Sequence, residues 1–282
     1  MSKRLVMIDF GGGGAAKSRI LQGYLNGFTF LEEKSGCNPS TTSGKNAFTL
    51  AEVLITLGII GIVASMTLPT LINNQRNKAL QTALKKAYSR HSEALMLVKD
   101  EMGVDNLRTE FATYDEDNKV YARSEEFYDA YYKKLKIIGQ CKYDKEIRNY
   151  NNTNTALLDR GNTNPLKMLA DGTCAEVLVN AGSINITVDI NGAGKGPNRV
   201  GHDIFVFEVN RQGMLEANKM SKLYSEEELK EFEDRPATME QLGDPCSIKS
   251  KQKGNGIGCT WYALYDENPD NPGARYWENL PK

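Results

Sequence analysis

The sequence predicts an α+β fold: a long N-terminal α-helix, half of it transmembrane, packs on a C-terminal head with an antiparallel β-sheet. Three patterns lead to this class. Residues 53–75 carry no charge and are mostly Leu, Ile, Val, Ala or Gly. Apolar residues then recur every three or four positions up to residue 102. From Cys174 onward the pattern changes to an alternation with period two, which is typical of half-buried strands.

The uncharged run, residues 53–75, is long enough to cross a bilayer, because a hydrocarbon core of about 30 Å needs roughly 20 apolar residues in a helix. Glu52 lies just before this run, and a carboxylate there is costly in lipid, so Glu52 is a candidate functional residue. Pro69 has no N–H, so we expect a kink or local melting of the helix. Four small residues share one helix face and would let another helix approach closely: Ala51, Gly58, Gly61 and Ser65.

Residues 47–52 read Ala-Phe-Thr-Leu-Ala-Glu and lead directly into the uncharged run. Together with Pro69, this motif resembles the class III signal of type IV prepilins and type II secretion pseudopilins, over about residues 45–80. The resemblance implies that a prepilin peptidase cuts between Ala47 and Phe48 and that the new amine of Phe48 is methylated. It also implies that Glu52 and Phe48 act in assembly, where Glu52 meets the amine of a neighbouring subunit. Ala47 departs from the family, which usually has Gly there.

The sequence divides into four predicted segments: a cytoplasmic leader 1–47, a transmembrane and assembly half-helix 48–75, a head-packing half-helix 76–103, and an exported head 104–282. The leader holds six Lys/Arg and three Asp/Glu, so the positive-inside rule places it in the cytoplasm. It is long for the family. It also contains a near P-loop at residues 11–18, which we interpret as a false positive, and a second prepilin-like motif at 27–32, which we interpret as a decoy because charged and polar residues follow it.

The head-packing half-helix has an apolar stripe and ends at Gly103. The stripe consists of Leu80, Leu84, Ala87, His91, Ala94, Leu95, Val98 and Met102. In the head we expect helices at residues 124–138 and 226–233, strands at 174–179, 183–190 and 203–209, and loops at 104–122 and 149–164. The segment 234–282 is rich in Pro, Gly and Asn, and its aromatic residues are expected to pack rather than to form a binding platform.

Four cysteines lie in the part predicted to be exported, where an even number indicates two disulfides with three possible pairings: Cys141, Cys174, Cys246 and Cys259. We expect Cys246 to pair with Cys259, because they are closest in sequence and glycines between them let the chain bend. Pilin-like heads often close a C-terminal loop in this way. Zinc is the competing interpretation, but the sequence lacks close Cys pairs or clustered His.

A glycine-rich turn carries oxygen-bearing side chains at Asp189, Asn191 and Asp203. Some pseudopilins bind calcium in the head, so these residues are a candidate metal site, although their spacing does not match an EF-hand. A turn held by side-chain hydrogen bonds is the favoured interpretation. We therefore expect no cofactor, with calcium as the alternative.

The sequence shows no catalytic motif, and its two histidines leave little acid–base chemistry, so we do not expect an enzyme. A net charge of −1 argues against a nucleic-acid-binding protein. The predicted function is that of a pilin-like subunit of a membrane-anchored filament, and the length of the processed chain favours a minor pilin. Its partners would be prepilin peptidase, other pilin or pseudopilin subunits, and the inner-membrane assembly machinery. The alternatives are a type II secretion pseudopilin, and an adhesin or receptor whose helix is only an anchor.

Overall fold

The computed structural model describes residues 48–116, 120–121, 123–156, 166–180, 182–220, 244–252 and 254–281. The leader with its two motif matches and the helix expected at 226–233 lie outside these residues. The chain forms two compact units, Met1–Leu54 and Ile55–Lys282. The described part of the first unit is the start of helix α1, and the second unit contains the rest of α1 and the head.

Helix α1 spans Leu50–Met102 and ends at Gly103, as predicted. The helix is continuous through Pro69, so of the two expected effects local melting is wrong and the kink stays a prediction. Two hydroxyls near this proline bond to carbonyls of the helix itself: Ser65 Oγ donates to Ile62 O at 2.7 Å and Thr67 Oγ1 to Val63 O at 3.0 Å. These bonds satisfy both hydroxyls without a partner from outside the helix, which lets them lie in an apolar segment.

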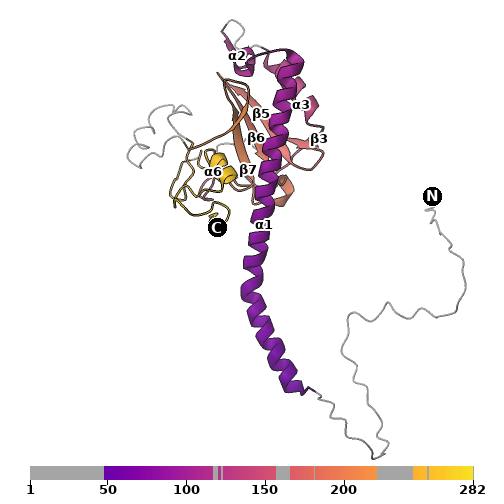
Figure 1. Cartoon of the computed structure of the whole chain (residues 1–282), viewed down its shortest axis with the longest axis vertical. Coiled ribbons are helices and arrows are strands. Elements are labelled where there is room, and N and C mark those ends of the chain that lie inside the picture. Colours follow the sequence, from indigo (N-terminus) through magenta and orange to yellow (C-terminus); the bar gives the residue numbers. More distant parts are fainter. Residues whose placement is uncertain are drawn as a thin grey trace, which may run out of the picture. The chain divides into compact units, whose positions relative to one another are not determined.

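The second half of α1 is buried along one face (Figure 1). Seven of the eight residues in the predicted stripe are buried and Met102 packs against the core, so the predicted packing face is confirmed. His91 is one of the seven: its ring Nδ1 lies 2.5 Å from the hydroxyl of Tyr131. An ion pair also holds this half of the helix, because Arg90 Nη2 lies 2.6 Å from Asp171 Oδ2 in the turn before β5.

The head contains a six-stranded antiparallel sheet with the order β3-β4-β5-β6-β7-β8. Its central strands are the three that the sequence predicted, and the three outer strands were missed. The bounds are β3 Ile137–Gln140, β4 Lys167–Leu169, β5 Cys174–Asn180, β6 Ser183–Asp189, β7 Ile204–Val209 and β8 Leu215–Ala217. The outer strands have three or four residues each, too few to show an alternation. A separate small sheet pairs β1 Tyr114–Asp115 with β2 Val120–Tyr121.

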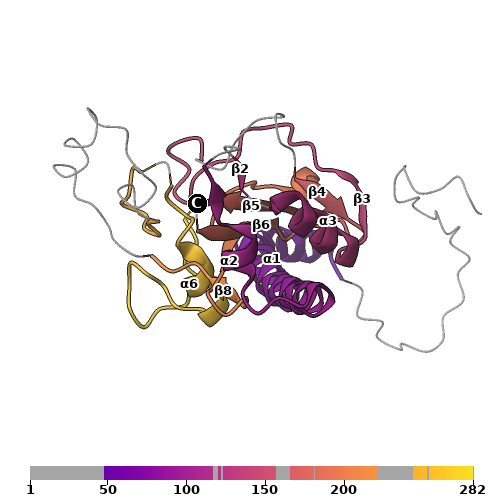
Figure 2. The same cartoon turned by 90° about the horizontal axis from the view of Figure 1, so that it is seen from above.

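One face of the sheet forms the main core with α1, as Figures 1 and 2 show. Alternate residues of the central strands point into this core, as period two requires: Ala175, Val177 and Val179 from β5, Ile184, Ile186 and Val188 from β6, and Phe205, Phe207 and Val209 from β7. The α+β class predicted from the sequence is therefore confirmed.

Helix α3, Ser124–Lys134, supplies hydrogen-bond acceptors to the part of β5 that has no pairing with β4. Strand β4 pairs only with Cys174 and Ala175, which leaves the later N–H groups of β5 facing α3. The hydroxyls of Tyr132 and Tyr128 accept the N–H groups of Val177 and Val179, both at 3.1 Å. Two tyrosines one helical turn apart thus stand in for a neighbouring strand, so these N–H groups are not left unpaired.

Helix α3 ends four residues earlier than predicted. Leu135 caps it, and Lys136 has φ +47°, a left-handed conformation that stops the helix. Ile137 and Ile138 then enter β3. The expectation of a helix to residue 138 was wrong, because β-branched residues after a left-handed position favour a strand over another helical turn.

Two short helices were not expected: α2 Leu107–Phe111 lies in a segment predicted to be a loop, and α6 Cys259–Tyr265 lies in the segment rich in Pro, Gly and Asn. In α6, the Thr260 hydroxyl donates to Val206 O at 2.7 Å and accepts the Val206 N–H at 3.1 Å. Tyr276 and Trp277 are buried, and the Trp277 ring N–H donates to Ala263 O at 2.8 Å. These two aromatic residues serve packing, as expected.

Candidate functional site

The start of α1 holds the predicted processing and assembly residues. Phe48 is 84% exposed and precedes the helix. Thr49 caps the helix and Glu52 reaches back to it: Glu52 Oε2 accepts the Thr49 N–H at 2.8 Å and its hydroxyl at 2.9 Å. The Thr49 hydroxyl in turn accepts the Glu52 N–H at 3.2 Å. This reciprocal arrangement is a capping box, and it fixes the helix start two residues after the predicted cleavage point.

The role of Thr49 was missed in the sequence analysis, although Thr49-x-x-Glu52 has the spacing of a capping box. Glu52 was singled out there only for the cost of its charge in lipid. The structure adds that its carboxylate is held in one orientation by its own chain. Both bonds use Oε2, so Oε1 is the oxygen of this carboxylate that a partner group would meet.

The half-helix that follows is exposed. From residue 50 to residue 79 only Ala64 and Asn77 are partly covered. A Cβ added at Gly58 or Gly61 would meet no atom within 4 Å, so no contact within the described chain requires a glycine there. Among the described residues, α1 is the one helix long and apolar enough to span a membrane.

The head contains both disulfides, in the predicted pairing. Cys141 bonds to Cys174 with a Cα–Cα distance of 6.2 Å, and Cys246 bonds to Cys259 with a Cα–Cα distance of 4.9 Å. The loop closed by the second disulfide is held from outside: Asn151 Nδ2 donates to Ser250 O at 2.7 Å, and Asp270 Oδ2 accepts the Ile248 N–H at 2.8 Å. These bonds hold the first part of the loop in place despite its lack of regular structure.

The candidate calcium residues lie together in the glycine-rich turn after β6. Asp189 Oδ1 accepts the N–H groups of Gly192 and Asn191 at 2.8 and 3.1 Å, and Oδ2 accepts the hydroxyl of Tyr143 at 2.9 Å. Gly192 has φ +86°, and a Cβ there would lie 2.2 Å from Gly172 O, so the turn requires glycine at this position.

Asp203 organises the other side of the same turn. Its Oδ1 accepts the Arg199 N–H at 2.8 Å, and its Oδ2 accepts the Asn198 N–H at 3.0 Å and the Asn191 side-chain amide at 3.3 Å. Burial and the nearby charge of Asp203 raise the pKa of Asp189 to about 7, and burial also raises the pKa of Asp203. Two buried amide oxygens, Asn191 Oδ1 and Asn198 Oδ1, have no hydrogen-bond partner in the described part of the chain.

The two histidines are packing residues. Burial lowers the pKa of His91 to about 4 and that of His202 to about 3, so both rings are neutral near pH 7. The ring Nε2 of His202 lies 3.2 Å from Tyr150 O. In the regions that the structure describes, no group of three or more His, Cys, Asp or Glu side chains could hold a metal ion.

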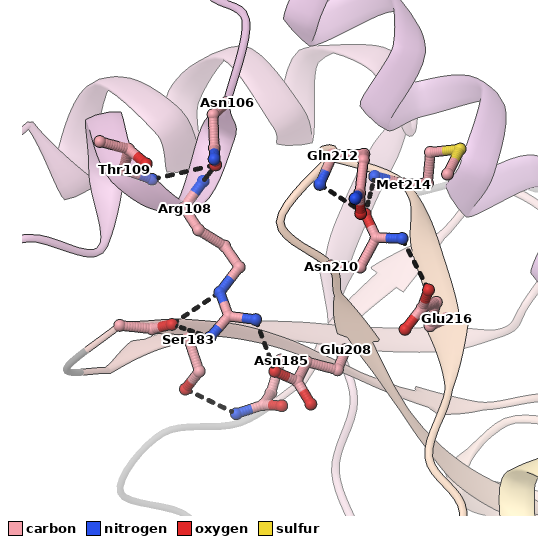
Figure 3. A network of polar contacts seen from close by, with 11 residues as sticks. Asn106, Arg108, Thr109, Ser183, Asn185, Glu208, Asn210, Gln212, Met214 and Glu216 are labelled. Atoms are coloured by element: carbon pink, nitrogen blue, oxygen red, sulfur yellow. Dashed lines mark hydrogen bonds and ion pairs between the residues drawn. The ribbon is translucent and has the colours of Figure 1, made fainter.

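A polar network at the other end of the sheet was not predicted (Figure 3). Arg108, in the first turn of α2, donates to Gly182 O from Nε at 2.6 Å and pairs with Glu208 of β7 at 3.1 Å. Nearby, Asn210 Oδ1 accepts the N–H groups of Gln212 and Met214, both at 2.9 Å, and shapes the turn between β7 and β8. Arg108 thus ties α2 to the β5–β6 connection and to β7, and Asn210 holds the β7–β8 turn, so both residues have structural roles.

Comparison with known families agrees with this geometry. The model of the prokaryotic N-terminal methylation motif matches residues 42–68, so the chain carries a prepilin-type cleavage and methylation signal followed by a long helix. Searches of curated proteins and of solved structures found no match. A second family model matches residues 70–266, which is more than half of the chain and includes the head-packing half of α1 and most of the head. The chain belongs to the family of unknown function DUF6613.

Proposed function

We propose that this protein is a minor type IV pilin, a structural subunit of a filament that is assembled from the membrane. The methylation signal makes the chain a pilin- or pseudopilin-like substrate of prepilin peptidase, and the long apolar helix anchors it in the membrane by a single pass. The assignment to a pilus, the cut between Ala47 and Phe48, and the export of the head are parts of the proposal. Two disulfides in the head support an oxidising compartment.

The observation that carries the proposal is the contrast along α1. One face of its second half is covered by the head, whereas residues 53–75 are uncharged, mostly apolar and almost entirely exposed, and a Cβ added at either glycine would meet no atom within 4 Å. In lipid such a segment is a stable anchor. Neighbouring helices that pack on its small-residue face would cover it in a filament.

Glu52 and Phe48 supply the polar part of this assembly. The capping box holds Glu52 Oε2, so Oε1 can accept a hydrogen bond from the methylated amine of Phe48 in the next subunit. Because a charge in an apolar core must be paired, this contact would select one axial position of the incoming helix. Thr49 then acts as a positioning residue for Glu52.

The proposed role is structural and not catalytic. The buried, neutral histidines support this, because neither imidazole is available for proton transfer near pH 7. The size of the processed chain, which loses residues 1–47 of 282, supports a minor subunit. A pseudopilin of a type II secretion system is the alternative in the same class, and an anchored adhesin or receptor is the alternative outside it.

We also propose that the turn around Asp189 needs no metal ion, because all four carboxylate oxygens of Asp189 and Asp203 accept hydrogen bonds. The two unpartnered amide oxygens favour the calcium alternative, since Ca²⁺ takes oxygen ligands of this type. Thermal unfolding of the full chain in calcium and in chelator separates the two. An unchanged Tm supports the turn, and a Tm raised by calcium supports a site.

The proposed function is tested by imaging cells with an antibody to the head. A pilin gives labelled filaments that extend from the surface, and an anchored adhesin or receptor gives label confined to the membrane. Deleting the gene tests the pseudopilin alternative. Loss of secretion with filaments intact would identify a pseudopilin and overturn the pilus assignment.

Variants at the capping box test the assembly contact. We expect Glu52→Ala and Thr49→Val to be cleaved but to enter filaments poorly, and Thr49→Ser to assemble normally because serine keeps the hydroxyl. Normal assembly of Glu52→Ala would overturn the proposed pairing with Phe48, and normal assembly of Thr49→Val would overturn the positioning role.

A further inference from the structure

The head joins α1 at the point where the apolar run ends. The run stops at Gln75, and the next residue, Arg76, donates a side-chain hydrogen bond to Gly196 O in the turn after β6. Asn77 Nδ2 donates to Trp277 O at 2.6 Å. No spacer therefore separates the membrane-spanning segment from the head, and both contacts lie within the compact unit Ile55–Lys282.

This junction sets the height of the head above a bilayer. Ile72 is the last apolar residue of the run, and residues 73–75 are Asn, Asn and Gln. At a rise of about 1.5 Å per residue, Arg76 lies about 6 Å beyond Ile72. The headgroup region on each side of the hydrocarbon core is of a similar thickness, about 5–7 Å. If Ile72 lies at the edge of the hydrocarbon core, Arg76 and the turn that it contacts are level with the lipid phosphates.

The exposed charges at this level are mostly positive. Arg76 and Lys78 are exposed on α1, and Lys195 is exposed in the short helix η1, Ala193–Lys195, directly before Gly196. We call these three residues the exit rim. The nearby carboxylate of Glu278 lies 2.8 Å from Arg275, so its charge is already paired. The acids behind the turn, Asp189 and Asp203, are fully buried.

We propose that the exit rim binds the headgroups of anionic phospholipids in the leaflet that faces the head. Lys and Arg held at the surface of an anionic membrane are attracted to it, and here the backbone contacts of Arg76 and Asn77 hold the rim at that surface. The contact orients the head on the bilayer before assembly. It depends only on membrane anchoring, so its failure would leave the proposed filament role intact.

The test is amine labelling of the full chain in nanodiscs, with each lysine quantified by mass spectrometry. Lys195 and Lys78 are compared in discs of phosphatidylcholine and in discs that also contain phosphatidylglycerol. We expect acylation of both lysines to be several-fold slower in the anionic discs. In 1 M salt, where the Debye length is about 3 Å, we expect the difference to disappear.

Lys133 is the matched control. It is exposed on α3, two residues after Tyr131, whose hydroxyl contacts His91, and His91 is fifteen residues beyond Arg76 along α1. That is about 22 Å farther from the bilayer and well beyond the Debye length of about 10 Å at 0.1 M salt. Its labelling should not depend on the lipid.

The variant Lys195→Gln should weaken the protection of Lys78, and Lys133→Gln should leave it unchanged. Equal labelling of Lys195 in neutral and anionic discs would overturn the proposal. A lipid effect that is the same at Lys195 and Lys133 would also overturn it, because it would not be local to the rim.

Discussion

The two halves of helix α1 differ in where their partners lie. Residues 80–102 bury one face against a sheet of the same chain, and the rest of that half is polar or faces solvent. Residues 53–72 are apolar almost all around and are exposed, apart from the partly covered Ala64. A helix that is apolar on every side requires lipid or other helices around it. One half of the helix therefore specifies the fold of the head, and the other half requires an environment that the chain does not itself provide.

The largest expected effect comes from truncating one leucine in each half. Leu84 is fully buried, so Leu84→Ala should lower the free energy of unfolding of the head by about 2–5 kcal/mol. Leu57 is 60% exposed, so Leu57→Ala should change it by less than about 0.5 kcal/mol. Denaturant unfolding of the full chain in detergent, followed by the fluorescence of buried Trp277, measures both. Equal losses would contradict the division of the helix into two halves.

The next effect comes from removing the disulfides of the head. Replacing both Cys246 and Cys259 with Ser should destabilise the head by about 3 kcal/mol, because the unfolded chain regains the freedom of a loop with a sequence separation of 13. Removing the Cys141–Cys174 disulfide, with a separation of 33, should cost slightly more. Thermal unfolding of each double variant shows which disulfide contributes more to the stability of the head. Non-reducing peptide mapping that joins Cys246 to Cys141 or Cys174 would contradict the pairing.

The buried acids of the head should make its stability depend on pH. The pKa of Asp189 is about 7 in the folded chain, above its usual value of 3.8, so the folded state binds more protons than the unfolded state between these values. The stabilising contribution of Asp189 should therefore be complete below about pH 4 and be lost as the pH rises to about 7, a change on the order of 4 kcal/mol. Denaturant unfolding across this range measures the slope. The variant Asp189→Asn should flatten it, and an unchanged slope would assign the effect to other groups.

A smaller effect is expected where α3 covers β5. Tyr132→Phe removes the hydroxyl that accepts the Val177 N–H and leaves that group unpaired, at a cost of about 1–3 kcal/mol. Tyr265→Phe is the control, because this ring is 64% exposed. Unfolding of both variants in urea compares them. A Tyr132→Phe head as stable as the control would mean that water reaches the edge of β5.

The sequence predicted the parts of the fold that carry a long periodic pattern. The apolar patterns of the stripe on α1 and of the three central strands repeat over enough residues to be recognised. The motif at Phe48 and Glu52 was recognised because it lies at the start of the uncharged run. The outer strands β3, β4 and β8 are too short for a period. Helix α6 was missed because glycines and asparagines flank it, and tertiary contacts such as that of Thr260 with Val206 hold it in place.

The candidate site was predicted in its residues but not in its geometry. The sequence identified Glu52 and Asp189, but only the structure shows which donors hold each carboxylate. The contact of Arg76 with Gly196 joins positions 120 residues apart, which no local pattern records. Sequence patterns thus identify chemical groups, and long-range contacts determine what those groups face.

The central claim is that the exposed half of α1 begins at a processed, methylated residue and enters an assembly. Mass spectrometry of the N-terminal peptide of the protein from cell membranes tests it most directly. If the chain is processed as proposed, we expect a peptide that begins at Phe48 and carries one methyl group on its amine. An uncleaved N-terminus, or one that begins at Phe28, would contradict it.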